Sequence, residues 1–89
     1  MIKIETTSGF ICELPKDAMD DMELVEILAK KDYPNEGFRN SDVASHLLGD
    51  KKQALYEHLR KIHGKVPATA VDTELREIFM AFRTEGKNS

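Results

Sequence analysis

The chain has 89 residues, of which 40% are hydrophobic and 33% charged, and its formal net charge is −3. This length suits one domain with a thin core, and the composition is that of a globular rather than a disordered chain. The apolar runs are too short to span a membrane, and the first residues lack the apolar core of a signal peptide. Cys12 has no second cysteine to pair with, so we expect a cytoplasmic, reducing setting.

The N-terminal residues predict a β-hairpin. Ile2 and Ile4 alternate with charged residues, which is the period of a half-buried strand. Residues 7–9, Thr-Ser-Gly, favour a turn, and residues 10–14 suit a second strand. Pro15 ends that strand because it has no backbone donor.

Residues 20–31 predict the helix around which the domain is built. The stretch begins with two acids and ends with two lysines, an order that matches the helix dipole. Asp20 with Glu23 three residues later has the capping-box spacing. More apolar side chains lie between them than one stripe needs, so we expect cover on more than one side. These side chains are Met22, Leu24, Val25, Ile27 and Leu28.

Residues 32–37 predict a loop. Pro34 disfavours helix at the residue before it, and Gly37 permits a left-handed turn. Phe38 is expected to anchor this loop in the core.

Two further helices are predicted from their boundaries. Asn40 or Ser41 caps the first of them, and Gly49 ends it. Asp50 caps the next, which Gly64 ends. Its apolar stripe has helical spacing and consists of Leu55, Leu59 and Ile62.

The last helix has the clearest amphipathic pattern, and Thr69 or Asp72 is expected to cap it. Its stripe is formed by Val71, Leu75, Ile78, Phe79 and Phe82. We expect residues 1–84 to form a single compact domain and residues 85–89 a flexible C-terminal tail. The predicted fold is α+β, mainly α, with an N-terminal β-hairpin followed by about four short helices.

The charges are distributed unevenly. Residues 13–26 contain six acids against one lysine, a balance of −5, whereas residues 50–65 contain five bases against two acids, a balance of +3. Two solvated helix faces explain this pattern, and so do complementary faces that set the register of self-association.

The histidines do not predict a metal site. His58 and His63 are five residues apart, as in the second half of a zinc finger, but Cys12 is the only cysteine. On one helix the two would also lie about 140° apart around the axis. His46 follows Asp42 by four residues, a spacing typical of a hydrogen bond on a helix face.

No catalytic constellation is evident in the sequence. Cys12 lies in an apolar strand without nearby basic residues, which favours a buried, inert thiol. Helix capping accounts for Asp20 and Asp21, and no glycine-rich phosphate loop is present. We therefore predict a protein that is not an enzyme, with no catalytic residue, metal or cofactor.

A DNA-binding alternative follows from the second and third helices. Residues 41–61 have the order of a helix-turn-helix, and the basic side chains Lys51, Lys52, Arg60 and Lys61 would contact phosphates. The acidic chain and the apolar character of the second of these helices argue against nucleic acid. A structural or adaptor protein is a further alternative.

Several short pieces, in this order, resemble one family, the short tail assembly chaperones of long-tailed phages and prophages of Gram-positive bacteria. The first are Thr-Ser-Gly-Phe at residues 7–10 and Asp-Asp-Met-Glu-Leu-Val-Glu at 20–26. Leu-Leu-Gly follows at 47–49, then Leu55 with His-Leu at 58–59, and Gly-Lys-Val-Pro at 64–67. Glu-Ile-Phe at 77–79 and the ending Lys-Asn-Ser complete the series, which covers most of the chain.

The resemblance implies a role and its partners. Proteins of this family bind the tape measure protein and keep it soluble in the host cytoplasm until tail-tube protein polymerises around it, and they are absent from the mature tail. Self-association, contact with tail-tube protein and a frameshifted longer form are further implications. Gly86, Lys87 and Asn88 can be encoded by GGA-AAA-AAC, which contains a slippery run.

The expected client is a long helical protein, so an apolar cleft rimmed by charge would suit it. The candidate partner-binding residues come from two helices: Met22, Val25, Leu28, Leu75, Phe79 and Phe82. Ordinary core packing is the alternative role for most of these side chains.

Overall fold

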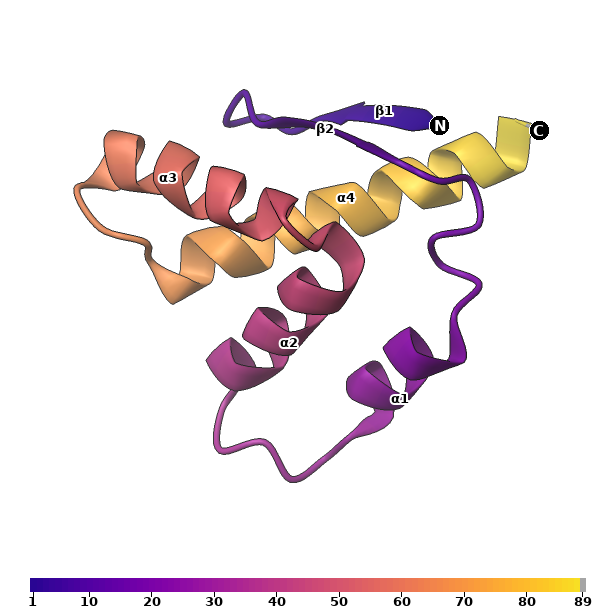
Figure 1. The fold of residues 1–89 in the computed structure, drawn as a ribbon, viewed down its shortest axis with the longest axis horizontal. Helices are drawn as coiled ribbons and strands as arrows, with labels where there is room; N and C mark the ends of the chain where they lie inside the picture. The colour runs from indigo at the N-terminus through magenta and orange to yellow at the C-terminus, as the bar shows by residue number, and fades with distance from the viewer. Residues whose placement is uncertain (89) are drawn as a thin grey trace.

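The computed structural model describes residues 1–88, with side chains described as far as Arg83. A hairpin of β1 (Ile2–Glu5) and β2 (Ile11–Leu14) precedes the helices, as Figure 1 shows. The helices of this part are α1 (Met22–Ala29), α2 (Glu36–Leu48), α3 (Lys51–His63) and α4 (Ala68–Asn88). The predicted α+β, mainly α fold is confirmed. No helix in residues 1–88 is both long and apolar enough to cross a membrane.

The hairpin is antiparallel, with Ile4 opposite Cys12 and both side chains buried. Its turn is closed by a hydrogen bond from the Thr6 N–H to the Phe10 carbonyl (2.9 Å). Gly9 has a φ of 93°, a left-handed conformation that favours glycine. The turn chemistry at residues 7–9 therefore lies where the sequence predicted it.

Two acids of α4 hold the hairpin turn. Glu77 accepts hydrogen bonds from the backbone N–H and the hydroxyl of Thr7, both at 2.8 Å. One turn earlier, Glu74 accepts from the hydroxyls of Thr6 (2.7 Å) and Ser8 (3.1 Å). A two-stranded hairpin is marginal alone, so these contacts and the apolar face below fix its position.

α1 is shorter than the predicted range 20–31, and its cap is one residue later. Asp21, rather than Asp20, accepts from the backbone N–H of Glu23 (3.0 Å). The backbone of Asp20 is occupied in a preceding turn, where its N–H donates to the Asp17 carbonyl (2.9 Å). A capping box at Asp20 was therefore wrong, because the turn places the next carboxylate over the helix N-terminus.

α2 starts at Glu36, inside the range 32–37 for which the sequence predicted a loop. The Asn35 side chain accepts from the backbone N–H groups of Gly37 (2.9 Å) and Phe38 (3.3 Å), which makes it the N-cap. Gly37 is thus helical. Phe38 lies in the first turn of the helix with an exposed side chain, so its predicted role as a core anchor was wrong.

The glycine boundaries were predicted correctly. Gly49 (φ 58°) ends α2 and Gly64 (φ 80°) ends α3, each with its N–H on a carbonyl of the preceding turn. α4 begins directly after Pro67, whose fixed φ suits a helix start, and not at a Thr69 or Asp72 cap. The helix extends to Asn88, into the range 85–89 that the sequence assigned to a tail. Ser89 lies outside the described residues, and flexibility of that range stays a prediction.

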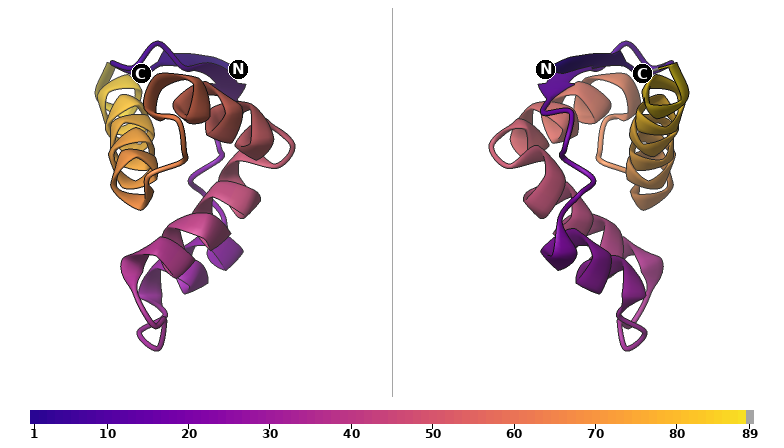
Figure 2. Two further views of the ribbon diagram at one scale, coloured as in Figure 1. Left: turned by 90° about the vertical axis from the view of Figure 1, so that its left-hand side faces the viewer. Right: turned by 90° about the vertical axis from the view of Figure 1, so that its right-hand side faces the viewer.

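The hairpin, α3 and α4 form one part of the molecule, and α1 with α2 forms the other (Figure 1). The hairpin lies across α3 and α4, whereas α1 packs along α2 (Figure 2). The start of α1 lies at His46 and its end at Arg39. The core joins all of them and includes Leu14, Leu24, Val43, Leu55, Leu59, Val71, Leu75 and Ile78. α1 packs mainly against α2, so much of its surface has no helix covering it.

Candidate functional site

α1 leaves three apolar side chains exposed. Met22, Val25 and Leu28 are 69%, 47% and 44% accessible, while Leu24 alone among its apolar residues is fully buried. The three are spaced three residues apart, so they lie along one side of the helix. The expectation that α1 is covered on more than one side was wrong for the single chain. The additional apolar side chains of α1 therefore form an exposed surface.

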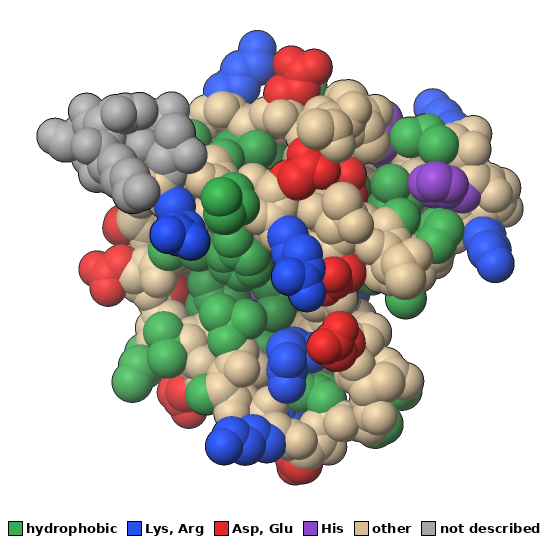
Figure 3. All heavy atoms as spheres, turned by 180° about the vertical axis from the view of Figure 1, so that it is seen from behind, with side chains coloured by type: hydrophobic (Ala, Val, Ile, Leu, Met, Phe, Trp, Pro, Cys, Tyr) green, Lys and Arg blue, Asp and Glu red, His purple; other side chains and the backbone are tan. Residues whose placement is uncertain are grey.

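Next to this surface lies a hollow between α1, α2 and α4, which we call the α1–α4 groove. Its cavity has a volume of about 160 Å³. It is lined by Leu28, Glu36, Arg39, Asn40, Asp72, Leu75, Arg76 and Phe79. Seen from behind, the face that carries α4 shows a continuous hydrophobic area bordered by basic and acidic side chains (Figure 3).

The groove brings together some of the predicted partner-binding residues. Leu28, Leu75 and Phe79 line it, although they come from opposite ends of the sequence. Leu75 is only 2% exposed and forms its floor, whereas Phe79 is half-buried. Phe82 is buried in the core and does not line the groove. That these residues bind a partner stays a prediction.

The α4 side of the groove carries a hydrogen-bonded ion pair. Arg76 Nε donates to Asp72 (2.7 Å), and the same carboxylate accepts from the Asn40 side chain (3.1 Å). The hydrogen bond from Arg76 is the main cause that lowers the pKa of Asp72. Asp72 is therefore neutralised locally, while the rest of the Arg76 side chain is largely exposed at the edge of the groove.

Arg39 is one of the polar residues of this groove that the sequence did not reveal. Its guanidinium lies over the Tyr33 ring and donates to the Lys30 carbonyl (3.1 Å). Its Nε is buried and has no hydrogen-bond acceptor among the described residues. A buried N–H without an acceptor is costly to the fold. A helix cap at Asn35 is the signal that would have placed Arg39 one turn inside α2.

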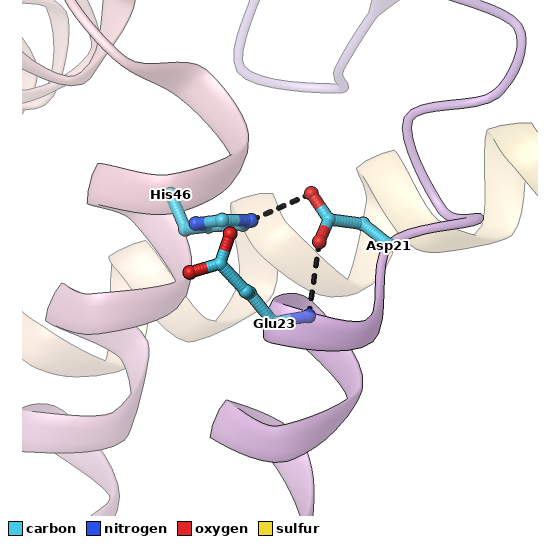
Figure 4. Close-up of side chains that lie close together, drawn as sticks. All are labelled: Asp21, Glu23 and His46. Atoms are coloured by element: carbon cyan, nitrogen blue, oxygen red, sulfur yellow. Dashed lines mark hydrogen bonds and ion pairs between the residues drawn. The ribbon is translucent and has the colours of Figure 1, made fainter.

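A second cluster joins α1 to α2. Figure 4 shows His46 pointing at Asp21, with Nε2 2.7 Å from Oδ2, and Glu23 beside them. Candidate ligand atoms of the three side chains lie within 4.8 Å of one another, a spacing compatible with a metal ion. Both Asp21 oxygens are engaged, however, since Oδ1 also caps the helix. The cap and the ion pair therefore account for the cluster. The predicted partner of His46, Asp42, instead accepts from the hydroxyl of Tyr33 (2.7 Å).

Comparisons of this chain with protein-family models, with curated proteins and with solved structures gave no match.

Proposed function

We propose that this protein is a tail assembly chaperone that binds an amphipathic helical segment of a phage tape measure protein in the α1–α4 groove. The observation that carries this proposal is the exposed apolar side of α1, Met22, Val25 and Leu28, beside a hollow lined by Leu75 and Phe79. The resemblance of the sequence pieces supplies the identity of the client. We propose the host cytoplasm as its location and no enzymatic activity.

The groove has the chemistry that helix-in-groove binding requires. A helix laid along it would cover side chains of α1 and α4 with its own apolar stripe. Full burial of a Val or Leu side chain contributes about 1.5–3 kcal/mol, so covering the exposed half of Val25 and of Leu28 adds on the order of 1 kcal/mol each. A few such contacts give a reversible complex, which suits a client that must later be released.

The polar edge of the groove would select the register of that helix. Arg39 has a buried Nε without an acceptor among the described residues, and Arg76 is exposed on the opposite helix. A carboxylate next to the apolar stripe of the client would pair with the exposed guanidinium of Arg76. We therefore propose that the bound segment carries an acid beside its apolar residues.

The DNA-binding alternative has less support. Lys51 donates to a backbone carbonyl of β2 (2.8 Å), Lys52 to two serine hydroxyls of α2 (3.1 and 2.7 Å), and Arg60 pairs with Glu57. Three of the four basic side chains expected to contact phosphates are thus engaged within the chain. Binding to duplex DNA at low salt without sequence preference would reverse this preference.

Co-expression with the neighbouring tape measure protein tests the main proposal. We expect the wild-type chain to raise the soluble fraction of that client. The double substitution Val25→Asp with Leu28→Asp should abolish this effect, because two charges would face an apolar stripe. Ile62→Asp is the matched control, since Ile62 is 51% exposed on α3, outside the groove. A client that stays equally insoluble with and without the wild-type chain would overturn the proposal.

Self-association, contact with tail-tube protein and a frameshifted longer product belong to the same proposal. The acidic and basic segments provide charges of opposite sign for contacts between copies. Sedimentation over a range of concentrations tests self-association, and a protein that stays monomeric at high concentration would contradict it. The gene tests the longer product, which loses its support without a slippery run near codons 86–88.

A further inference from the structure

Glu74 is an acid in the position of a core residue. It is 3% exposed, and it lies between the buried stripe residues Val71 and Ile78 of α4. A buried carboxylate is normally paired with a cation or coordinates a metal, because leaving water is costly for a charge. Among residues 1–83, no Lys, Arg or His forms an ion pair with Glu74.

The donors that reach Glu74 are neutral. The hydroxyls of Thr6 (2.7 Å) and Ser8 (3.1 Å) both donate to Oε1. No donor among the described residues is bonded to Oε2. His58 Nε2 lies 3.1 Å from the Ser8 hydroxyl and 3.0 Å from the Ser8 carbonyl, so Ser8 separates this ring from the carboxylate. Glu74 thus keeps capacity for a charged donor, which would form a stronger bond than a hydroxyl does.

A cavity opens beside this carboxylate. It lies between the hairpin turn, the end of α3 and the start of α4, and its volume is about 480 Å³. We call it the Glu74 cavity, and it is lined by Thr7, Ser8, Leu59, His63, Pro67, Thr69, Ala70, Thr73 and Glu74. Its walls combine apolar surface with hydroxyl groups, and no Lys or Arg is among them.

We propose that the Glu74 cavity binds an aliphatic ammonium group, presented by a free alkylamine or by a lysine side chain. The ammonium donates to the Glu74 carboxylate, and neighbouring hydroxyl oxygens accept its remaining hydrogens. The alkyl stem packs on Leu59, Pro67 and Ala70. The site is separate from the α1–α4 groove and does not depend on the function proposed for that groove.

Titration of the ¹⁵N-labelled protein tests the site by the amide shifts of residues that line it. The probes are n-butylammonium and Nα-acetyl-lysine methylamide, with n-butanol and the Nε-acetylated lysine derivative as uncharged controls. We expect saturable shifts at Thr7, Ser8 and Thr73 with the charged probes only. Binding of the lysine derivative alone assigns the site to a protein side chain, and binding of butylammonium alone assigns it to a free amine. No saturable shift with either charged probe, or equal binding of the uncharged controls, overturns the proposal.

Two substitutions connect the binding to Glu74. Glu74→Gln should weaken it by at least about tenfold, since a charge-assisted hydrogen bond is lost. Glu26→Gln, an exposed acid on α1 and outside the cavity lining, should leave it unchanged. Thr73→Tyr fills the cavity from an exposed position without removing the acid, so it remains informative where Glu74→Gln fails to fold. Unchanged affinity in Thr73→Tyr or in folded Glu74→Gln contradicts the assignment.

Discussion

His46 on α2 and Asp21 at the start of α1 are joined by a 2.7 Å contact between Nε2 and Oδ2. The same carboxylate caps α1 through the Glu23 N–H, so one side chain both begins the helix and ties it to its main neighbour. The hydrogen bond to His46 is the main cause that lowers the pKa of Asp21. Attachment of α1 is therefore linked to pH.

We expect this contribution to stability to disappear in acid. The pKa of Asp21 in the folded chain lies below its ordinary value of 3.8, so the stabilising effect of this carboxylate is present above that value. It is lost as the pH falls through the lower, folded pKa. Asp21→Asn keeps a capping oxygen but removes the charge. Urea unfolding should separate the free energies of unfolding of the two proteins at about pH 6, and the difference should shrink as the pH falls through the folded pKa of Asp21. A difference independent of pH would contradict the linkage.

Adjacent positions on α1 should respond differently to truncation. Leu24 is 1% exposed, so Leu24→Ala should lower the free energy of unfolding by about 2–5 kcal/mol. Val25→Ala should change it by less than about 0.5 kcal/mol, because that side chain is half exposed. Denaturant unfolding measures both. A large loss for Val25→Ala would mean that the exposed side of α1 is covered in solution, as it would be by a second copy.

The sequence predicted the apolar excess of α1 but not which side chains it exposes. Periodicity reports how many apolar residues a helix carries, whereas cover depends on how many neighbours the fold provides. In this chain α2 is the main neighbour. Leu24 is buried and Val25 is not, although both are apolar residues of the same short helix.

α2 and α4 show two other limits of prediction. At Asn35, one side-chain oxygen caps a helix within a stretch where Pro34 and Gly37 favoured a loop. The helix forms despite these helix-breaking residues, because the Asn35 cap satisfies two backbone donors at once. Glu74 was missed because an acid on a helix is usually solvated. Its spacing, three residues after Val71 and four before Ile78, places it on the buried stripe and was the available signal.

The hydroxyl of Thr6 should contribute more to the free energy of unfolding than that of Thr7. Thr6 is buried and donates to the buried Glu74, so Thr6→Val leaves a carboxylate with one donor fewer and should cost about 1–3 kcal/mol. Thr7→Val removes an exposed bond to Glu77 and should cost less than about 1 kcal/mol. Thermal unfolding of the two variants makes the comparison. Equal losses would show that Glu74 does not depend on its Thr6 donor.

Gly64 should be sensitive to any side chain for conformational reasons alone. Its φ is 80°, and a Cβ added there would meet no atom within 4 Å. Gly64→Ala should therefore destabilise the chain by about 1–2 kcal/mol through backbone strain without a steric clash. Gly64→Asn should cost less, because Asn tolerates the left-handed region. Denaturant unfolding measures both, and an unchanged stability in Gly64→Ala would argue that α3 ends differently in solution.

Cys12 should report on unfolding through its reactivity. Burial raises the pKa of its thiol above the ordinary value of 9.0, with the charge of Lys51 opposing the shift and that of Glu74 adding to it. Near neutral pH the folded chain therefore contains less of the reactive thiolate than the unfolded chain does. Alkylation by iodoacetamide should be slow in buffer and should rise with urea along the unfolding transition.

Lys51→Met provides the matched control for this reactivity. It removes the cation that opposes the shift, so native alkylation should become slower still while the rate in urea stays the same. Because the pKa of Cys12 is raised, burial of its neutral thiol contributes fully to stability below the pKa of the unfolded chain. This contribution is lost as the pH rises through the pKa of the folded chain. Native alkylation at the rate of a free thiol would show that β2 is not covered as the structure describes.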